Sequence, residues 1–118
     1  MAGITTKSFS SPDETRTPPN TTVEVVRLGG TTAARFTFQP GWRWSSDVAP
    51  VVATDSCQSR HVGAVHQGTL HLLHEDGTET EVSVGDAYII EPGHDGWVVG
   101  DEPVVVLEFE SAESYARA

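Results

Sequence analysis

The side chains best suited to chemistry in this sequence are one cysteine and two histidines. Cys57 is the only cysteine of the chain, His61 follows it by four residues, and His94 comes directly after a Pro-Gly turn signal. Thiolate and imidazole are favoured protein ligands for zinc, copper and ferrous iron. Cys57, His61 and His94 are therefore candidate ligands of a divalent metal ion, and zinc, iron, copper, nickel and manganese all stay open.

The spacing of these residues suggests how they could meet. Alternate residues of an extended chain point to the same side, which places Asp55, Cys57 and His61 on one face. Asp55 or Asp47 is then a candidate further ligand or general base. The competing interpretation is structural, because a lone cysteine is often a small buried apolar residue and a histidine entering a strand is often only hydrogen-bonded.

Aromatic residues could form the wall of a pocket beside this site. Trp42 and Trp44 flank Arg43, so in a strand both indoles would share one face. Ligand pockets are concave and mostly apolar with a few polar groups. The predicted pocket residues are Trp42, Trp44, Gln67, Tyr88 and Trp97, although the two neighbouring tryptophans could equally be ordinary core residues.

The remaining histidines fall on the other side of the predicted strands. Leu70 and Leu72 would face inward, which leaves His71 facing outward and His74 near a turn. His66 is likewise on the outer face. We therefore expect that none of these three histidines is a metal ligand.

Short β-strands must position these residues, because apolar or alternating runs from Val23 onward are separated by turn signals such as Gly-Gly, Pro-Gly and Gly-Asp. One of these runs, "WRWS", includes Trp42 and Trp44. Asp76-Gly77 predicts a β-hairpin with a type I′ turn, which needs positive φ at both central residues. About seven or eight such strands predict an all-β fold, a small antiparallel β-barrel of the jelly-roll type.

The two ends of the chain differ from this β-rich part. Residues 1–22 are rich in Ser, Thr and Pro, which predicts a flexible N-terminal arm that could also lie along a sheet edge. Residues 23–110 form the predicted barrel. Residues 111–118 form a short tail in which Ser111 could cap a helix and Tyr115 could pin it to the barrel.

Composition narrows the classes of function. The 118 residues give room for one domain, and a net charge of −10 repels nucleic-acid phosphates and anionic lipids. A single cysteine cannot form an internal disulfide, and no apolar run reaches the roughly 20 residues that span a bilayer. We therefore expect a cytoplasmic protein without nucleic-acid or membrane partners. Phosphate-binding loops, CxxC pairs, GxSxG elbows and HExxH motifs are absent from the sequence.

The run from Val65 to Phe109 resembles the cupin superfamily. It has a glycine closing one strand, a hairpin, a Gly-Asp step, another strand, a Pro-Gly turn and a last pair of strands. The stretches "PGWRWSSDVAP", "TDSCQSRH" and "PGHDGWVVGDEP" are similar to a subgroup of small bacterial cupins of unassigned activity. The resemblance implies a jelly-roll barrel, in many members of which histidines and a glutamate hold a divalent metal.

The metal-binding motifs of cupins match only in part. An alignment on Gly68 puts His61 at the usual glutamate and Asp55 and Cys57 at the usual paired histidines. An alignment on Pro40-Gly41 puts Asp47 and Ala49 at that pair instead. In the second motif, Gly96 stands at the usual histidine, with His94 two residues earlier.

Two functions of different classes remain. The first is a metal-dependent cupin enzyme acting on a small organic molecule in the barrel cavity, with oxygenase, isomerase and lyase chemistry all open. The second is a metal-free small-molecule-binding module without catalysis. A homodimer is also expected, because Ala64, Leu73 and the run 104–109 would leave apolar surface facing outward.

Overall fold

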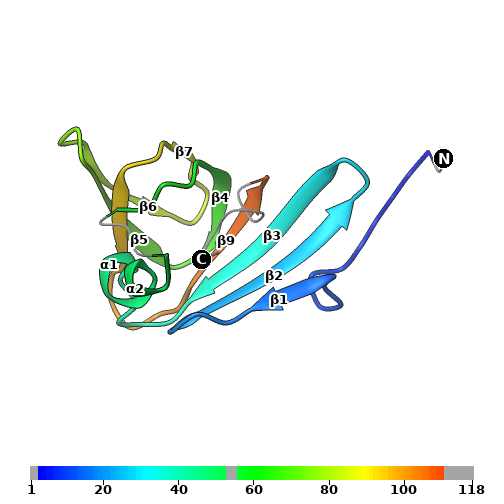
Figure 1. The fold of residues 1–118 in the computed structure, drawn as a ribbon, viewed down its shortest axis with the longest axis horizontal. Coiled ribbons are helices and arrows are strands. Elements are labelled where there is room, and N and C mark those ends of the chain that lie inside the picture. Colours follow the sequence, from blue (N-terminus) through cyan, green and yellow to red (C-terminus); the bar gives the residue numbers. More distant parts are fainter. Residues whose placement is uncertain (1–2, 53–55, 111–118) are drawn as a thin grey trace.

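The computed structural model describes residues 3–52 and 56–110, which fold into two antiparallel β-sheets (Figure 1). The larger sheet holds, in spatial order, β1 (Glu14–Arg16), β2 (Thr21–Leu28), β3 (Thr31–Phe38), β9 (Val104–Phe109), β4 (His61–Gln67) and β7 (Ala87–Ile90). The smaller sheet holds β6 (Glu79–Ser83), β5 (Thr69–His74) and β8 (His94–Val98). Two short helices, α1 (Trp44–Asp47) and α2 (Ala49–Val52), connect β3 to β4, and no helix in the described ranges is long and apolar enough to cross a bilayer.

The predicted all-β antiparallel fold of the jelly-roll type is confirmed, but the closed barrel is not seen. Backbone hydrogen bonds join neighbouring strands within each sheet, and across residues 3–52 and 56–110 no strand ladder joins one sheet to the other. Single bridges from Arg43 to Trp97 and from Cys57 to His94 contact the edge strand β8. The fold is therefore two packed sheets with a core between them.

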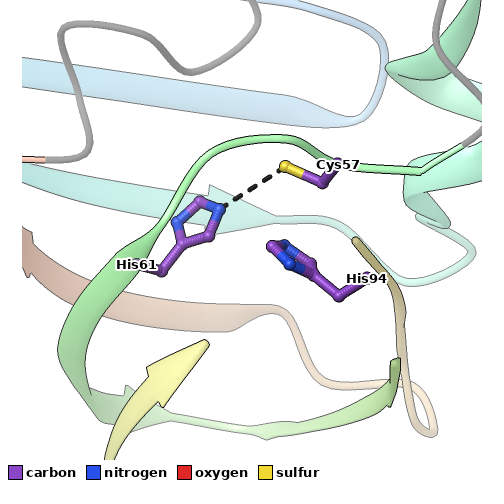
Figure 2. Close-up of side chains that lie close together, drawn as sticks. All are labelled: Cys57, His61 and His94. Carbon is purple, nitrogen blue, oxygen red and sulfur yellow. Dashed lines mark hydrogen bonds between the residues drawn. The ribbon is translucent and has the colours of Figure 1, made fainter. Parts of the chain in front are cut away.

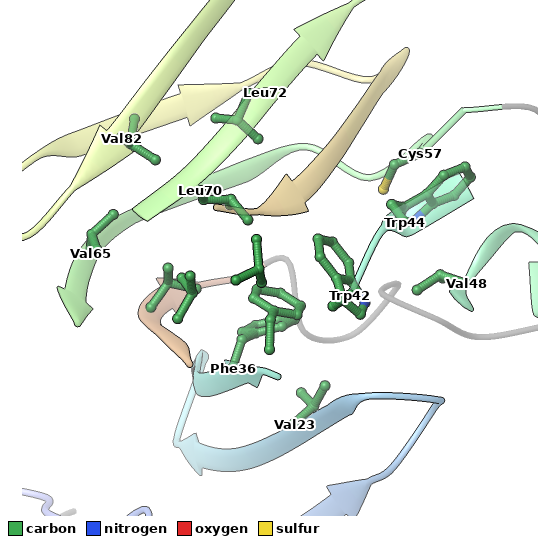
Figure 3. Packing of buried hydrophobic residues seen from close by; sticks show 14 of the residues in the cluster. Val23, Phe36, Trp42, Trp44, Val48, Cys57, Val65, Leu70, Leu72 and Val82 are labelled. Carbon is green, nitrogen blue, oxygen red and sulfur yellow. The ribbon is translucent and has the colours of Figure 1, made fainter. Parts of the chain in front are cut away.

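Alternation along each strand builds this core. Val23 and Val25 of β2 and Val104 and Val106 of β9 are fully buried and alternate with neighbours of intermediate exposure. Phe36 of β3 packs with them, and the smaller sheet adds Leu70, Leu72 and Val82 from its inner face (Figure 3). The inward register of β9 ends at a charged residue, Glu108, which is 4% exposed.

The segment predicted as the strand "WRWS" is instead the start of a helix. Arg43 is extended, with φ −143°, and Trp44 begins α1. The carboxylate of Asp47 accepts hydrogen bonds from the Arg43 backbone N–H at 3.1 Å and from the Asn20 amide at 3.3 Å, which holds the chain at the start of this helix. Trp42 and Trp44 are both buried nevertheless.

The hairpin predicted at Asp76-Gly77 is confirmed, but the predicted turn type is wrong. Strands β5 and β6 pair antiparallel from Thr69 opposite Ser83 to Leu73 opposite Glu79. Gly77 has φ +94°, whereas Asp76 is not among the described residues with positive φ, so a type I′ turn is excluded. Hydrogen bonds from the Gly77 N–H to the His74 carbonyl and from the His74 N–H to the Thr78 carbonyl close a three-residue loop with glycine in its last position.

Part of the predicted N-terminal arm belongs to the larger sheet. Strand β1 (Glu14–Arg16) pairs antiparallel with β2, and β2 itself begins at Thr21. Residues 14–16 therefore lie along a sheet edge, which is the alternative that the sequence left open for the arm. The predicted helical tail, residues 111–118, lies outside the described residues.

Candidate metal centre

Cys57, His61 and His94 come together inside the protein (Figure 2). Their exposed fractions are 3%, 5% and 5%. One possible ligand atom from each side chain lies within 4.8 Å of the other two, and the Cys57 Sγ is 3.6 Å from the His61 Nε2. The rings of His61 and His94 are nearly perpendicular, with centroids 5.0 Å apart. These three residues form the group that we call the Cys-His cluster.

A backbone bridge, rather than strand alternation, places Cys57 in the cluster. Strand β4 begins at His61, and Cys57 lies outside it in an isolated bridge to His94. The Cys57 N–H donates to the His94 carbonyl at 2.7 Å, and the Gly93 N–H donates to the Cys57 carbonyl at 2.7 Å. The predicted shared face of Asp55, Cys57 and His61 is therefore not the reason that Cys57 and His61 meet. Asp55 lies outside the described residues.

Both histidine rings are oriented by acceptors at Nδ1. The His61 Nδ1 lies 2.6 Å from Oε1 of Glu108, and the His94 Nδ1 donates to the Glu91 carbonyl at 2.7 Å. A histidine that donates through one nitrogen presents the other to a ligand, and metal-bound histidines almost always have such a partner. The Nε2 atoms of His61 and His94 are thereby left for the cluster.

Glu108 is itself held in place by Tyr88. The Tyr88 hydroxyl donates to Oε2 of Glu108 at 2.5 Å, which extends the chain of contacts to Tyr88–Glu108–His61–Cys57. Gly63 is opposite Tyr88 on β7 and opposite Glu108 on β9. A Cβ at Gly63 would meet the Leu107 carbonyl and would lie 2.8 Å from the Glu108 Cγ and 3.1 Å from the Tyr88 hydroxyl. Glycine at this position therefore makes room for the Tyr88–Glu108 contact.

The sequence pattern did not single out Glu108. The run "VVVLEF" predicts a strand, and its alternation could have shown that Glu108 shares the inward register of Val104 and Val106. An acidic residue at an inward strand position is costly unless it is paired. That conflict is the signal that would have found Glu108.

The electrostatics of the cluster favour a thiolate at Cys57 and an imidazolium at His61. Burial raises the pKa of the Cys57 thiol, but hydrogen bonds and charge from His61 and His94 outweigh burial and lower this pKa to about 6. Burial lowers the pKa of His61, but the charge of Glu108 and the contact with Cys57 outweigh it and raise this pKa to about 10. A bound cation would take the place of the His61 proton beside the thiolate.

A small cavity adjoins the Cys-His cluster. Its volume is about 30 Å³, and apolar residues of β3, β5 and β7 form much of its wall. The lining residues that matter for chemistry are Trp42, Trp44, His61, His94, Gly96 and Glu108. Of the predicted pocket residues, Trp42 and Trp44 thus line this cavity.

The other predicted pocket residues lie elsewhere. Trp97 is on the outer face of β8, between Arg43 at 4.4 Å and the stacked ring of His71 at 4.5 Å, because its neighbours His94, Gly96 and Val98 take the inward positions. The Gln67 amide donates to the Pro103 carbonyl at 3.1 Å. Tyr88 holds Glu108, as described above. None of these three residues lines the small cavity.

Asp47 and the remaining histidines are outside the Cys-His cluster. Asp47 holds the start of α1, so its predicted role as ligand or base needs correcting. His66 is exposed, His71 stacks on Trp97, and His74 hydrogen-bonds the Pro92 carbonyl at 2.9 Å. Their predicted positions outside the Cys-His cluster agree with the structure, although His74 lines the pocket beside His94.

Comparison with known proteins connects this arrangement to solved structures only through the fold. No family model matches the sequence, and no curated protein matches it. KdgF from Halomonas sp. is similar with a TM-score of 0.59 at 19% identity, covering 81% of this chain and 84% of that protein.

Two further solved structures carry the cupin name. A cupin superfamily protein from Desulfitobacterium hafniense has a TM-score of 0.54 at 10% identity, covering 80% of this chain and 79% of that one. The Cnp3 cupin domain of Schizosaccharomyces pombe has a TM-score of 0.58 at 12% identity, covering 86% and 69%. Identities this low bear on the fold alone, and they show that this chain shares the fold of these cupins.

Proposed function

We propose that the Cys-His cluster holds a divalent metal ion and that the chain is an enzyme acting on a small organic molecule. The observation that carries this proposal is the convergence of three buried ligand atoms, two of them on histidines whose Nδ1 atoms are already occupied. One thiolate and two imidazoles suit zinc, copper or ferrous iron.

The donor set fits an ion. Two donors on a tetrahedral ion lie roughly 3.5 Å apart, given the usual bond lengths to nitrogen and sulfur. The Cys57 Sγ and the His61 Nε2 are 3.6 Å apart and already have this spacing. The ligand atoms of all three residues lie within 4.8 Å of one another, so a side-chain shift of about 1 Å brings them to the spacing that an ion needs. Three protein donors leave a position for water or substrate, where the ion would supply Lewis acidity.

A larger pocket adjoins the small cavity and has room for an organic molecule. It has a volume of about 260 Å³ and lies between the β5–β6 hairpin and the segment that joins β7 to β8. Ile90 and His94 line both this pocket and the small cavity. In this proposal the bulk of the substrate lies in the outer pocket, and its reacting group reaches the open position of the ion past Ile90 and His94.

The test is the metal content of protein purified without an affinity tag. We expect about one ion per chain, and loss of that ion in Cys57→Ala and His94→Ala, because each change removes one of three donors. The matched control is His66→Ala, which removes an exposed histidine away from the cluster. A chelator should lower the melting temperature of the parent and of the control.

Several results would contradict the metal proposal. A parent without bound metal, or Cys57→Ala and His94→Ala proteins with the parent's metal content, would favour the alternative of a metal-free binding module. The chelator response separates the cases further, because it should disappear in both cluster variants.

We also propose that the protein is a homodimer. The outer face of β4, β7 and β9 presents Ala64, Ala87, Ile89 and Phe109 to solvent, which gives this part of the larger sheet an apolar surface. Sedimentation should give twice the 12.7 kDa mass of the chain, and Ala64→Arg should reduce it to the monomer. A parent that sediments as a monomer at micromolar concentration contradicts the proposal.

A further inference from the structure

The outer pocket beside His94 lies where the two sheets are open to each other. In the described part of the chain, β6 is an end strand of the smaller sheet and β7 an end strand of the larger one. The pocket lies between them, with the β5–β6 hairpin on one side and residues 89–91 on the other. Its volume of about 260 Å³ is near the lower end of the roughly 300–1,000 Å³ that is usual for small-molecule sites. The pocket therefore has the size of a site for one small organic molecule.

The wall of the outer pocket combines apolar surface with carboxylates. Leu72, Leu73 and Ile90 supply apolar side chains, whereas Asp76 and Glu91 supply two carboxylates. Among the described residues, no lysine or arginine lines this pocket. Such a wall favours an apolar molecule that carries a positive charge, and it repels carboxylates and phosphates.

The negative charge of Asp76 is not neutralised by its neighbours. The Asp76 Oδ1 accepts a hydrogen bond from the Thr78 N–H at 2.8 Å, which is the main cause that lowers the pKa of Asp76 below its usual 3.8. This backbone donor carries no net charge. His74 adds none either, because its Nδ1 accepts from the Asp76 N–H at 3.0 Å while its Nε2 donates to the Pro92 carbonyl, which is the pattern of a neutral imidazole. Asp76 therefore presents a full negative charge at the pocket.

Glu91 shares its charge with a cation outside the pocket. The Arg60 Nε lies 3.0 Å from the Glu91 Oε1, and 51% and 59% of the two side chains are exposed. An ion pair this exposed is weak, because water solvates both groups. Arg60 is not among the residues that line the pocket, so the charge of the wall stays negative.

The proposed ion explains why the positive charge of a substrate belongs in the outer pocket. A divalent ion repels a cation, which keeps a charged amine away from the open position. Glu108, the acidic residue that lines the small cavity, is already in contact with His61 and Tyr88. A molecule whose uncharged end passes Ile90 and His94 would therefore keep its positive end in the outer pocket.

We propose that the outer pocket binds an organic ammonium ion, whose apolar part packs against Leu72, Leu73 and Ile90 and whose charge faces Asp76 and Glu91. This inference rests on the proposed function, because it takes the outer pocket as the place of the substrate. It adds the charge class of the substrate and two residues that determine specificity.

The first test compares three probes of similar size and different charge: benzylamine, benzyl alcohol and benzoate. Their dissociation constants are measured at neutral pH and low salt from amide shifts in nitrogen-15 spectra, in which the signals of residues 72–80 and 89–91 should move. Benzylamine should bind about tenfold more tightly than benzoate, with benzyl alcohol between them, because each solvated carboxylate changes the affinity by up to about fivefold. Added salt should reduce the difference, since it screens these charges.

The second test removes the charge of Asp76 and keeps its hydrogen bond. Asp76→Asn retains an oxygen that accepts the Thr78 N–H, and it should reduce the preference for benzylamine over benzoate by about threefold. Asp86→Asn is the matched control, because Asp86 is also exposed, also accepts a backbone N–H, that of Ser83 at 2.9 Å, and does not line the outer pocket. The control should keep the preference of the parent.

The pair of Arg60 and Glu91 allows a change in each direction. Glu91→Gln should reduce the preference for benzylamine less than Asp76→Asn does, because Arg60 already offsets part of the Glu91 charge. Arg60→Gln removes that cation and should increase the preference. An unchanged preference in Asp76→Asn and Glu91→Gln would mean that benzylamine does not bind through the carboxylates of the pocket.

The outcomes separate this inference from the metal centre, because the metal content of each sample is measured as well. A parent without bound metal overturns the metal centre, whichever probe it prefers. A parent that binds none of the three probes, or that binds benzoate as tightly as benzylamine, overturns the ammonium pocket alone. A preference that persists in Asp76→Asn and Glu91→Gln, or that falls equally in Asp86→Asn, overturns it too.

Discussion

Each face of the larger sheet carries a glutamate paired with a basic side chain, but the two pairs differ in how far they are exposed to water. On the inner face, Glu108 contacts His61 at 2.6 Å, and both side chains are about 5% exposed. On the outer face, Arg35 of β3 pairs with Glu24 of β2 at 2.8 Å, and 33% and 20% of the two side chains are exposed. The inner pair must overcome the loss of hydration, whereas the outer pair is screened by water. The inner pair is therefore better explained by what it orients than by stability.

Removal of one partner should show this contrast most strongly. Glu108→Ala leaves His61 and the Tyr88 hydroxyl without their buried acceptor, and we expect a loss of roughly 3–5 kcal/mol in the free energy of unfolding. Glu24→Ala breaks the solvated pair and should cost less than about 1 kcal/mol. Denaturant unfolding of both metal-free variants measures the difference, and equal losses would refute the contrast.

The next largest loss of stability is expected at Gly63, which leaves space for the Glu108 side chain of the inner pair. Gly63→Ala would bring a Cβ against the Leu107 carbonyl and the Glu108 side chain, and we expect a loss of roughly 2–3 kcal/mol because backbone must shift. Gly30→Ala is the matched control, since a Cβ there meets nothing within 4 Å and Gly30 lacks a positive φ. Denaturation midpoints that fall equally for both variants would mean that Gly63 is not a packing constraint.

The smallest effect is expected at the solvated end of the sheet, where Asp13 accepts hydrogen bonds from Lys7 and from the Arg27 backbone N–H. The Lys7 hydrogen bond, followed by that of Arg27, lowers the pKa of Asp13 below its usual 3.8. Its contribution to stability is therefore present above the unfolded-state pKa and is lost as pH falls through the folded-state pKa.

Asp13→Asn should accordingly lower the melting temperature slightly at neutral pH, and the difference from the parent should vanish in strong acid. Asp101→Asn, at an exposed turn, is the control. A difference that grows as the pH falls would contradict the assigned sign.

Local patterns in the sequence predicted the strands well, because alternation and turn residues act over a few neighbours. The pairing of β5 with β6 follows from two alternating runs around Asp76-Gly77. The turn type was missed, since the number of residues in the loop is set by the register of the whole hairpin. The start of α1 at Trp44 was missed as well, because it depends on contacts of Asp47 with Arg43 and with distant Asn20.

The candidate site was predicted by residue type more than by geometry. Thiolate and imidazole chemistry pointed to Cys57, His61 and His94, yet Cys57 reaches the cluster through a bridge to a strand 37 positions away, which no local pattern contains. Glu108 lies still further along the chain. Trp97 was assigned to the pocket by its aromatic character, although strand alternation from His94 already turns it outward.

The bridge between Cys57 and His94 also bears on how the protein opens. His61 belongs to the larger sheet and His94 to the smaller one, and no strand ladder connects these sheets across the described ranges. An ion held by both histidines would add a cross-link between the two sheets, which the chain at Gly68 and the isolated bridges to β8 already connect. Amide hydrogens of β5 and β8 would then exchange together with those of β4 and β9 in the loaded protein, and separately from them once the ion is removed.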